Sequence, residues 1–137
     1  MNFGAKKSLG QNFLNDNNVI KIIADIGNID RNDFILEVGA GTGNLTEKIL
    51  EQSPKKIFVI EKDQRLALYL NEKFGDKINI FNEDMMTFEY ERYYKDKLII
   101  FGNLPYNIST QILAKWIRIK NLDSFCKKFI LIPASPK

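Results

Sequence analysis

The sequence predicts an α/β fold built on a parallel sheet, and three observations carry this prediction. Short apolar runs alternate with segments whose apolar residues recur at helical spacing, an order typical of strands joined by crossover helices. A glycine-rich turn, Gly39-Ala-Gly-Thr-Gly43, stands between the first apolar run and the helix that follows it. Glycine or polar residues also follow the later apolar runs directly. Because the carboxyl ends of parallel strands form the ligand crevice of such folds, we expect a binding site there.

The amino-terminal part predicts an arm followed by a helix. Residues 1–15 are mostly polar and include two glycines. Asp16 is suited to cap a helix because its carboxylate can accept N–H groups of the first turn, and Gly27 is suited to end it. One face of this helix carries apolar residues at helical spacing: Val19, Ile20, Ile23 and Ile26.

The remaining chain predicts a regular alternation of strands and helices. We expect strands at 34–38, 57–61, 78–81, 98–102 and 129–132. Helices are expected at about 44–52, 64–74 and 109–119, with Ser109 as the N-cap of the last one. Pro54 and Gly75 follow the first two of these helices, where residues that end helices are common. The sequence contains no internal repeat, so we expect a single domain.

Length and composition limit the class of protein. At 137 residues the chain is at most one domain, and 45% hydrophobic with 27% charged residues is ordinary for a globular protein. No apolar run approaches the ~20 residues of a membrane span, so we expect no membrane association. With one cysteine, Cys126, and no histidine, neither a metal site nor a histidine-dependent triad is expected. The net charge of +3 is too small to indicate nucleic acid by itself.

The glycine turn predicts a ligand that approaches the backbone closely. Glycines at 39, 41 and 43 let the chain bend sharply, and the next helix points free N–H groups at the ligand. The spacing G-x-G-x-G differs from the G-x-G-x-x-G of dinucleotide sites, and Glu37 before the turn would repel a phosphate. A ligand with an ammonium group, a carboxylate and a ribose fits better, and Glu61 lies about where a carboxylate binds a ribose hydroxyl. The alternative is a turn that binds nothing, although three alternating glycines are costly without a use.

Three motifs carry a resemblance to a known family. The segment Glu37-Val-Gly-Ala-Gly-Thr-Gly-Asn-Leu-Thr46 resembles the first motif of S-adenosylmethionine-dependent methyltransferases. With Lys7-Ser-Leu-Gly-Gln-Asn-Phe-Leu14 before it and Asn103-Leu-Pro-Tyr106 after it, the chain resembles the ribosomal RNA adenine dimethyltransferases, most of all their small-subunit group. The resemblance covers residues 6 to about 117 and implies a Rossmann-like fold. It also implies a cytoplasmic enzyme that uses S-adenosylmethionine to dimethylate the exocyclic amine of adenines in small-subunit ribosomal RNA.

The resemblance implies a cofactor site at the ends of successive strands. In the family, the amino-terminal arm folds over the cofactor. An acidic residue at the position of Asp84 accepts a hydrogen bond from the exocyclic amine of the cofactor's adenine. Read from the residues alone, the arm is a terminus with a Phe-Leu packing anchor, and Asp84 is a turn or cap residue. The implied cofactor-binding residues are Asn12, Leu14, Gly39, Gly41, Glu61, Asp84 and Asn103.

The predicted catalytic residues are Asn103, Leu104, Pro105 and Tyr106. An adenine amine is a poor nucleophile because its lone pair is delocalised into the ring. The side-chain oxygen of Asn103 and the carbonyl of Leu104 can grip its N–H groups and localise that lone pair, while Pro105 fixes the direction of the carbonyl. Tyr106 offers a ring for the target base, a contact worth about 1–3 kcal/mol. In isolation, such a tetrapeptide could also be a proline turn that leads to a helix.

The sequence departs from the family after the expected fifth strand. Family members are about twice as long and add two strands and a helical carboxy-terminal domain that helps to engage RNA. Here Pro133 and Pro136 follow the last apolar run, and we expect them to end the strand. We therefore expect residues 1–137 to form a single, incomplete methyltransferase domain, with 1–15 as its cofactor-covering arm. We expect it to bind the cofactor weakly and not to methylate RNA by itself.

Other functions remain open at this point. The expected partner is the precursor of the small ribosomal subunit, and the expected state is a monomer without a metal. Methylation of large-subunit RNA requires the same motifs, so it is the first alternative. A non-catalytic RNA-binding or ribosome-assembly module is the second, and a gene product without function is the third. Binding of S-adenosylhomocysteine would separate the enzymes from a module that only binds RNA.

Overall fold

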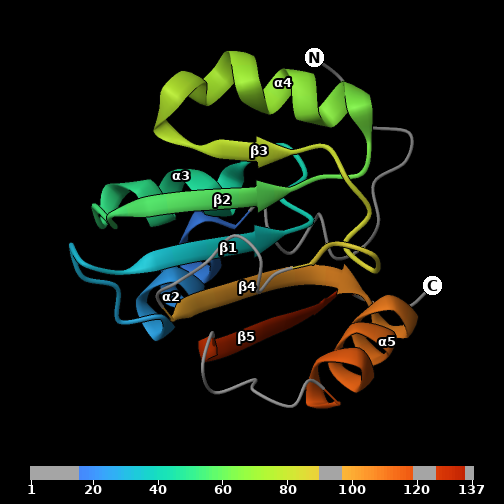
Figure 1. The fold of residues 1–137 in the computed structure, drawn as a ribbon. Coiled ribbons are helices and arrows are strands. Elements are labelled where there is room, and N and C mark those ends of the chain that lie inside the picture. The colour runs from blue at the N-terminus through green and yellow to red at the C-terminus, as the bar shows by residue number, and fades with distance from the viewer. Residues whose placement is uncertain (1–15, 90–96, 119–125, 135–137) are drawn as a thin grey trace.

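The computed structural model describes residues 16–89, 97–118 and 126–134. In this part of the chain, one sheet of parallel strands has the order β3-β2-β1-β4-β5 (Figure 1). The predicted parallel sheet is thereby confirmed. Its strands are β1 (Phe34–Val38), β2 (Lys56–Ile60), β3 (Asn79–Phe81), β4 (Leu98–Pro105) and β5 (Cys126–Ala134).

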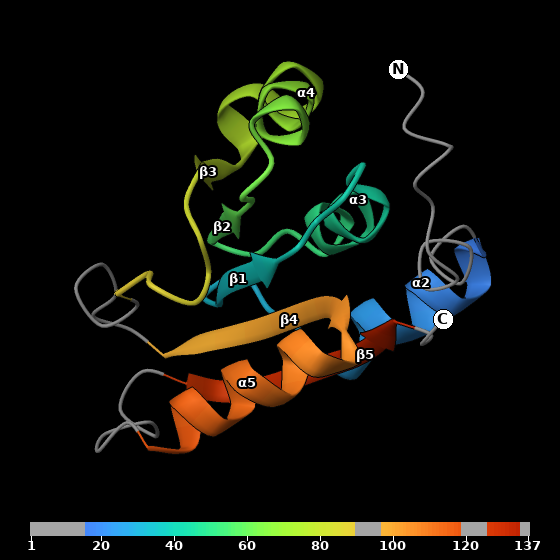
Figure 2. The same cartoon turned by 90° about the vertical axis from the view of Figure 1, so that its right-hand side faces the viewer.

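Helices cover both faces of this sheet (Figure 2). The helices α2 (Asn17–Ile26), α3 (Asn44–Glu51) and α4 (Gln64–Phe74) pack on one face, and α5 (Tyr106–Ile117) packs on the other. A short 3-10 turn, η2 (Gly75–Lys77), follows α4. Because both faces are covered, the strands carry near-continuous apolar runs, and successive side chains enter opposite cores.

Alternate residues of one strand show how the two cores divide. Ile35 of β1 lies in the core beneath α2 and α3, whereas Leu36 lies in the core beneath α5. Trp116 of α5 is fully buried in that second core, where its ring meets Phe129 of β5 edge-on at 4.5 Å between centroids. The sheet is therefore a rigid central layer whose strand ends can hold a site in place.

The predicted N-cap of α2 is confirmed, and α4 begins with an N-cap of the same kind. The Asp16 carboxylate accepts the N–H of Asn18 at 2.9 Å and that of Val19 at 3.4 Å. At α4, the Asp63 carboxylate accepts the N–H of Arg65 at 2.8 Å in the same way. Each carboxylate satisfies N–H groups that the first helical turn leaves without a backbone partner.

Several predicted boundaries are wrong in β4, α5 and β5. β4 continues to Pro105 instead of ending at 102, because Asn103, Leu104 and Pro105 pair with the end of β5. α5 accordingly begins at Tyr106, and Ser109 is not its N-cap. β5 runs from 126 to 134 rather than 129–132, so the strand continues through Pro133. A proline is tolerated there because β5 is an edge of the described sheet, where no neighbour needs its missing N–H.

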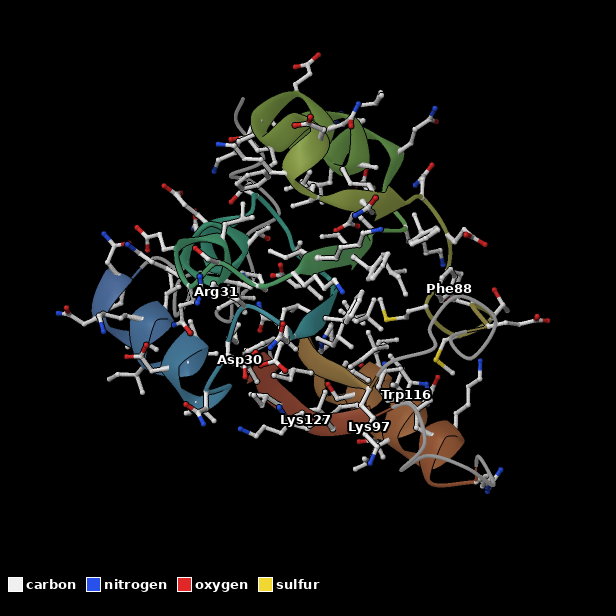
Figure 3. The ribbon with its side chains drawn as sticks, turned by 60° about the vertical axis from the view of Figure 1, so that its left-hand side comes forward. Asp30, Arg31, Phe88, Lys97, Trp116 and Lys127 are labelled. Atoms are coloured by element: carbon white, nitrogen blue, oxygen red, sulfur yellow. The ribbon has the colours of Figure 1, made fainter. Side chains whose placement is uncertain are left out.

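Lysine contacts tie β5 to the loop before β1, at the end of the sheet where the strands begin. Lys127 lies 3.1 Å from the buried carboxylate of Asp33, and Lys128 donates to the carbonyl of Gly27 at 3.0 Å. Figure 3 shows Lys127 and Asp30 together at this end, and the Asp30 N–H donates to Asp33 at 2.8 Å. The basic residues of β5 thus act at the end opposite the expected site.

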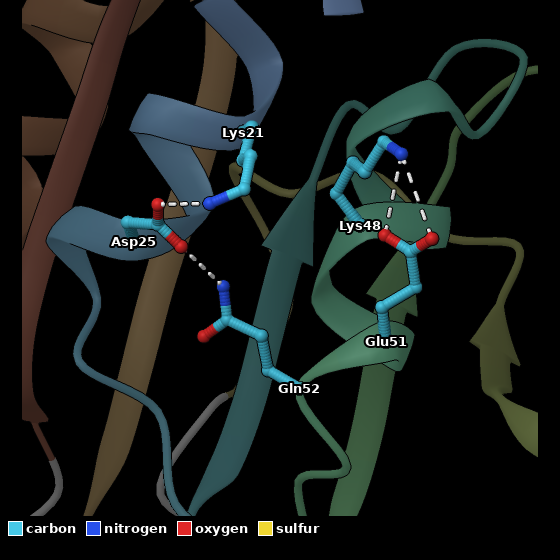
Figure 4. Close-up of polar contacts among 5 residues, drawn as sticks. All are labelled: Lys21, Asp25, Lys48, Glu51 and Gln52. Carbon is cyan, nitrogen blue, oxygen red and sulfur yellow. Dashed lines mark hydrogen bonds and ion pairs between the residues drawn. The ribbon is translucent and has the colours of Figure 1, made fainter. Parts of the chain in front are cut away.

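A second polar contact joins α2 to α3 on the outer surface (Figure 4). Asp25 accepts a hydrogen bond from Lys21 at 2.9 Å and another from Gln52 at 3.0 Å. Lys48 and Glu51 pair at 3.3 Å along α3. These contacts are exposed, so they orient the helices and add little to stability.

Candidate functional site

Predicted site residues from different strands meet at the carboxyl end of the sheet. Gly39 follows β1, Glu61 follows β2, Asp84 follows β3, and Asn103 lies in the last part of β4. Backbone hydrogen bonds hold the first two in line: Gly39 donates to the carbonyl of Ile60 at 3.2 Å, and Glu61 donates to that of Phe81 at 3.0 Å. Asn12 and Leu14, and also the ring of Tyr106, lie outside the described part of the molecule.

The glycine turn has the geometry that its sequence predicts. Gly39, Gly41 and Gly43 have φ values of +75°, +60° and +88°, which side chains rarely adopt. A Cβ at Gly43 would lie 2.6 Å from the ring of Phe74, and one at Gly39 would lie 2.9 Å from Leu104. At Gly41 no described atom would lie within 4 Å. Two glycines therefore permit close packing, and the middle one leaves space above the turn for a ligand.

Lys73 of α4 fixes the turn from outside. Its ammonium group donates to the carbonyl of Thr42 at 3.1 Å. Because Phe74 also packs against Gly43, the end of α4 braces the turn at two adjacent residues. This brace joins segments 31 residues apart, and only the folded chain reveals it.

Glu37 lies beneath the turn, with only 2% of its surface exposed. The hydroxyl of Thr46 in α3 donates to its carboxylate at 2.5 Å. Burial is the main cause that raises the pKa of Glu37 to about 7; the hydrogen bond from Thr46 opposes this rise, and the charge of Glu61 adds a smaller one. The sequence assigned Glu37 only a repulsion of phosphate, whereas the structure gives it a bond that links β1 to α3.

Glu61 faces the glycine turn and is 7% exposed. Its carboxylate accepts the N–H of Asp63 at 3.0 Å. Burial raises the pKa of Glu61, and the N–H groups of Asp63 and Gly41 partly offset this rise because they stabilise the charged form. A carboxylate held beside Gly41 in this way is suited to accept a hydrogen bond from a ligand hydroxyl.

Asp84 closes a turn after β3. One carboxylate oxygen accepts the N–H of Met86 at 2.9 Å, and the backbone carbonyl accepts the N–H of Phe88 at 3.0 Å. The other carboxylate oxygen lies 3.5 Å from the ammonium group of Lys62. The Met86 N–H, and next the charges of Lys62 and Lys115, hold the pKa of Asp84 below its usual range. Asp84 is thus a turn residue, which is the interpretation that the residues alone favour. Its second oxygen, the outward one, is not used within the turn and lies beside Lys62.

Asn103 and Leu104 bring the tetrapeptide against the glycine turn. The side-chain oxygen of Asn103 is buried and accepts no hydrogen bond from any described residue. The Leu104 side chain contacts the position where a Cβ of Gly39 would stand, and its carbonyl accepts the hydroxyl of Ser109 at 3.2 Å. A buried acceptor without a partner costs about 1–3 kcal/mol, so this oxygen is suited to accept a hydrogen bond from a ligand donor.

Sequence reasoning missed several contacts that position the site. Ser109 was predicted to be an N-cap, although hydroxyls in a first helical turn also bond back to earlier carbonyls. Thr46, Lys73 and Lys115 gave no local signal, because their partners are distant in sequence. Within the described ranges, no group of three or more acidic, cysteine or histidine residues could hold a metal ion. No helix in those ranges is long and apolar enough to cross a membrane.

Comparisons with known proteins agree with this geometry. A family model described as ribosomal RNA adenine dimethylase matches residues 2–134. The chain is 53% identical over 113 residues to the ribosomal RNA small subunit methyltransferase A of Pelagibacter ubique (strain HTCC1062), and the match covers 82% of this chain and 43% of that protein.

Solved structures show the same arrangement. A dimethyladenosine transferase from Plasmodium falciparum superimposes with a TM-score of 0.70 at 26% identity, over 85% of this chain and 41% of that one. The 23S rRNA methyltransferase ErmE superimposes with a TM-score of 0.69 at 28% identity, over 79% and 43%. The predicted Rossmann-like methyltransferase fold is confirmed, and the chain spans less than half the length of each of these relatives.

Proposed function

The chain belongs to the ribosomal RNA adenine dimethylase family, and from this premise we propose that it supplies the S-adenosylmethionine-binding and base-binding part of an adenine dimethyltransferase. The proposed substrate is the exocyclic amine of adenines in small-subunit ribosomal RNA. The proposed partner is the precursor of the small ribosomal subunit, which the protein would engage in the cytoplasm as a monomer. The observation that carries this proposal is the buried side-chain oxygen of Asn103, which has no described partner, on a residue whose backbone lies against Gly39 of the glycine turn.

The described residues fit the proposed cofactor. Gly41 leaves open space above a turn that two other glycines hold closed, and the Glu61 carboxylate lies beside it. In the proposed complex Glu61 accepts a ribose hydroxyl, and the outward oxygen of Asp84 accepts the amine of the cofactor's adenine. Asn12 and Leu14 would cover the cofactor from the arm. When bound, S-adenosylmethionine supplies an electrophilic methyl group.

The acceptor side depends on two oxygens of β4. The Asn103 side-chain oxygen and the Leu104 carbonyl would accept the two N–H groups of the target amine and draw its lone pair toward the methyl group. The Leu104 carbonyl accepts the Ser109 hydroxyl in this structure, so the target amine would take the place of that hydroxyl in the proposed complex. Pro105 has an extended backbone with φ −53° and ψ 148°, which sets the direction in which the chain leaves this carbonyl.

Contact between the two motifs supports a shared reaction centre. The hypothetical Cβ of Gly39 would lie 3.1 Å from the carbonyl oxygen of Asn103 and 2.9 Å from the Leu104 side chain. The backbone that would hold the cofactor and the backbone that would hold the target amine therefore touch without a spacer. Positioning two reactants in this way is the main requirement of a methyl transfer that needs no strong base.

Calorimetry of the chain with S-adenosylhomocysteine tests the cofactor half of the proposal. We expect saturable binding by the parent chain and weaker binding by Glu61→Ala. Lys21→Met is the matched control, because Lys21 lies on the surface of α2, where it pairs with Asp25. A folded parent chain that binds no S-adenosylhomocysteine would refute the proposal and favour a module that only binds RNA.

Transfer of labelled methyl groups tests the acceptor half. The chain is incubated with undermethylated small subunits and, separately, with undermethylated large subunits. Label in small-subunit adenines supports the proposal. Label only in large-subunit RNA supports the second candidate, which the structural similarity to the 23S rRNA methyltransferase ErmE favours. Cofactor binding without label in either subunit is the result expected for residues 1–137 alone, and the same two incubations with an intact relative that carries the same tetrapeptide then identify the RNA.

A further inference from the structure

The turn at Asp84 is held from two sides. From within, the Asp84 carboxylate accepts the N–H of Met86 at 2.9 Å. From outside, the ammonium group of Lys115 donates to the backbone carbonyl of the same Met86. The backbone N–H and the backbone carbonyl of Met86 are therefore both held by charged side chains. Such a turn has few ways to move without losing a charge-assisted hydrogen bond.

Lys115 reaches this turn from the helix that follows the acceptor residues. It lies in α5, which begins at Tyr106 directly after Asn103, Leu104 and Pro105. The contact joins residues 29 positions apart and is partly buried. One lysine therefore links the element that carries the target-base residues to the turn that carries Asp84.

Lys62 contacts Asp84 in a different way. It lies 3.5 Å from the outward carboxylate oxygen, but its side chain is 72% exposed. Salt and water weaken such a pair, so Lys62 can yield its place to a ligand amine. Lys115 contacts the backbone of the turn and not that oxygen, so it can hold the turn while a ligand is bound.

We propose that Lys115 is a positioning residue that aims the outward oxygen of Asp84 and so makes the cofactor site selective for a purine with an exocyclic amine. This inference rests on the proposed function, because it takes the cofactor's adenine as the ligand of Asp84. The Lys115 charge also favours the charged form of Asp84, in the same direction as the Met86 N–H and Lys62. The Met86 N–H, Lys62 and Lys115 thus all stabilise the carboxylate form of Asp84, the form that only accepts hydrogen bonds.

A pair of ligands separates positioning from general stability. S-adenosylhomocysteine carries the purine amine, and S-inosylhomocysteine has a carbonyl oxygen in its place. We expect the parent chain to bind the amine ligand more tightly. Lys115→Met, which keeps an unbranched side chain of similar length and removes its donors, should lose about three- to tenfold for the amine ligand, the range expected for one hydrogen bond. It should lose less than about twofold for the inosyl ligand.

Further variants keep the inference testable. Lys115→Arg should restore most of the preference, because it keeps a charged donor, and Lys21→Met should bind both ligands like the parent. In an Asp84→Asn background, Lys115→Met should cost little, because the two residues act on the same contact. Lys115→Leu, which also removes the donors, replaces Lys115→Met if thermal melting shows that the latter does not fold.

The outcomes are distinct. Equal losses for both ligands, or no loss for either, would overturn the role of Lys115 and leave the proposed function standing. Additive losses in the Asp84→Asn background would overturn it as well. A parent chain that binds both ligands equally would show that Asp84 does not read the amine, and this inference would fail. A parent chain that binds neither ligand would refute the proposed function itself.

Discussion

Replacing Glu37 by glutamine should remove most of a pH dependence of stability that the buried carboxyl creates. Glu37 is fully buried with a pKa of about 7, against an ordinary value of 4.5. Because the folded state holds this proton more tightly, the contribution of Glu37 to stability is fully present below pH 4.5. It is lost as the pH rises through about 7. Glutamine keeps the size of the side chain and can still bond to Thr46.

The size of the effect follows from that shift. A shift of roughly 2.5 pKa units corresponds to about 3 kcal/mol in full, at 1.36 kcal/mol per unit. Between pH 5 and pH 8 the parent chain should lose about 2–3 kcal/mol of this contribution. The raised pKa of Glu61 adds a loss in the same direction, so Glu37→Gln should retain a shallower slope and not a flat profile.

Urea unfolding at a series of pH values measures this difference. The free energy of unfolding is extrapolated to water for the parent, Glu37→Gln and Thr46→Val. Thr46→Val removes the hydroxyl that stabilises the charged form, so it should cost more at pH 8 than at pH 5. If the parent and Glu37→Gln had the same slope, Glu37 would titrate at an ordinary pKa, and the account of the buried bond beneath the glycine turn would be wrong.

Three further predictions concern the site. Glu61→Ala should weaken binding of S-adenosylhomocysteine by about 1–3 kcal/mol, the usual loss for a charge-assisted hydrogen bond. Unchanged affinity in calorimetry would remove Glu61 from the site. Asn103→Leu should keep the stability of the ligand-free chain or raise it by about 1 kcal/mol, because the Asn103 oxygen has no described partner. In an intact relative that carries the same tetrapeptide, replacing the residue that corresponds to Asn103 by alanine should lower the rate of single-turnover label transfer, and a rate equal to that of the parent would argue against the acceptor mechanism. Gly43→Ala should destabilise the chain by about 1–3 kcal/mol, since its φ is +88° and a Cβ would lie 2.6 Å from Phe74. Gly41→Ala, strained at φ +60° but without a clash, is the control in the same unfolding assay, and equal losses would show that the contact with Phe74 does not matter.

Local sequence signals and tertiary contacts determined different parts of the last strands. The apolar run after residue 97 predicted β4 correctly at its start, because buried strands of parallel sheets are apolar throughout. Its end was wrong by three residues, because Asn103, Leu104 and Pro105 are held in the sheet by β5, a partner distant in sequence. Because of the same pairing, α5 starts at Tyr106, three residues before the predicted start. Ser109, the expected N-cap, instead donates a hydrogen bond to the carbonyl of Leu104.

The fold, the glycine turn and the identity of the strand-end residues could be predicted from the sequence alone. These follow from local rules, since the period of apolar residues and the backbone freedom of glycine need no distant partner. Only the tertiary structure decided how those residues are held: Thr46 on Glu37, Lys73 on Thr42 and Lys115 on Met86. It also decided that the Asn103 oxygen is buried without a described partner. Burial and long-range hydrogen bonds depend on which segments pack together, and a chain read in one dimension does not contain that information.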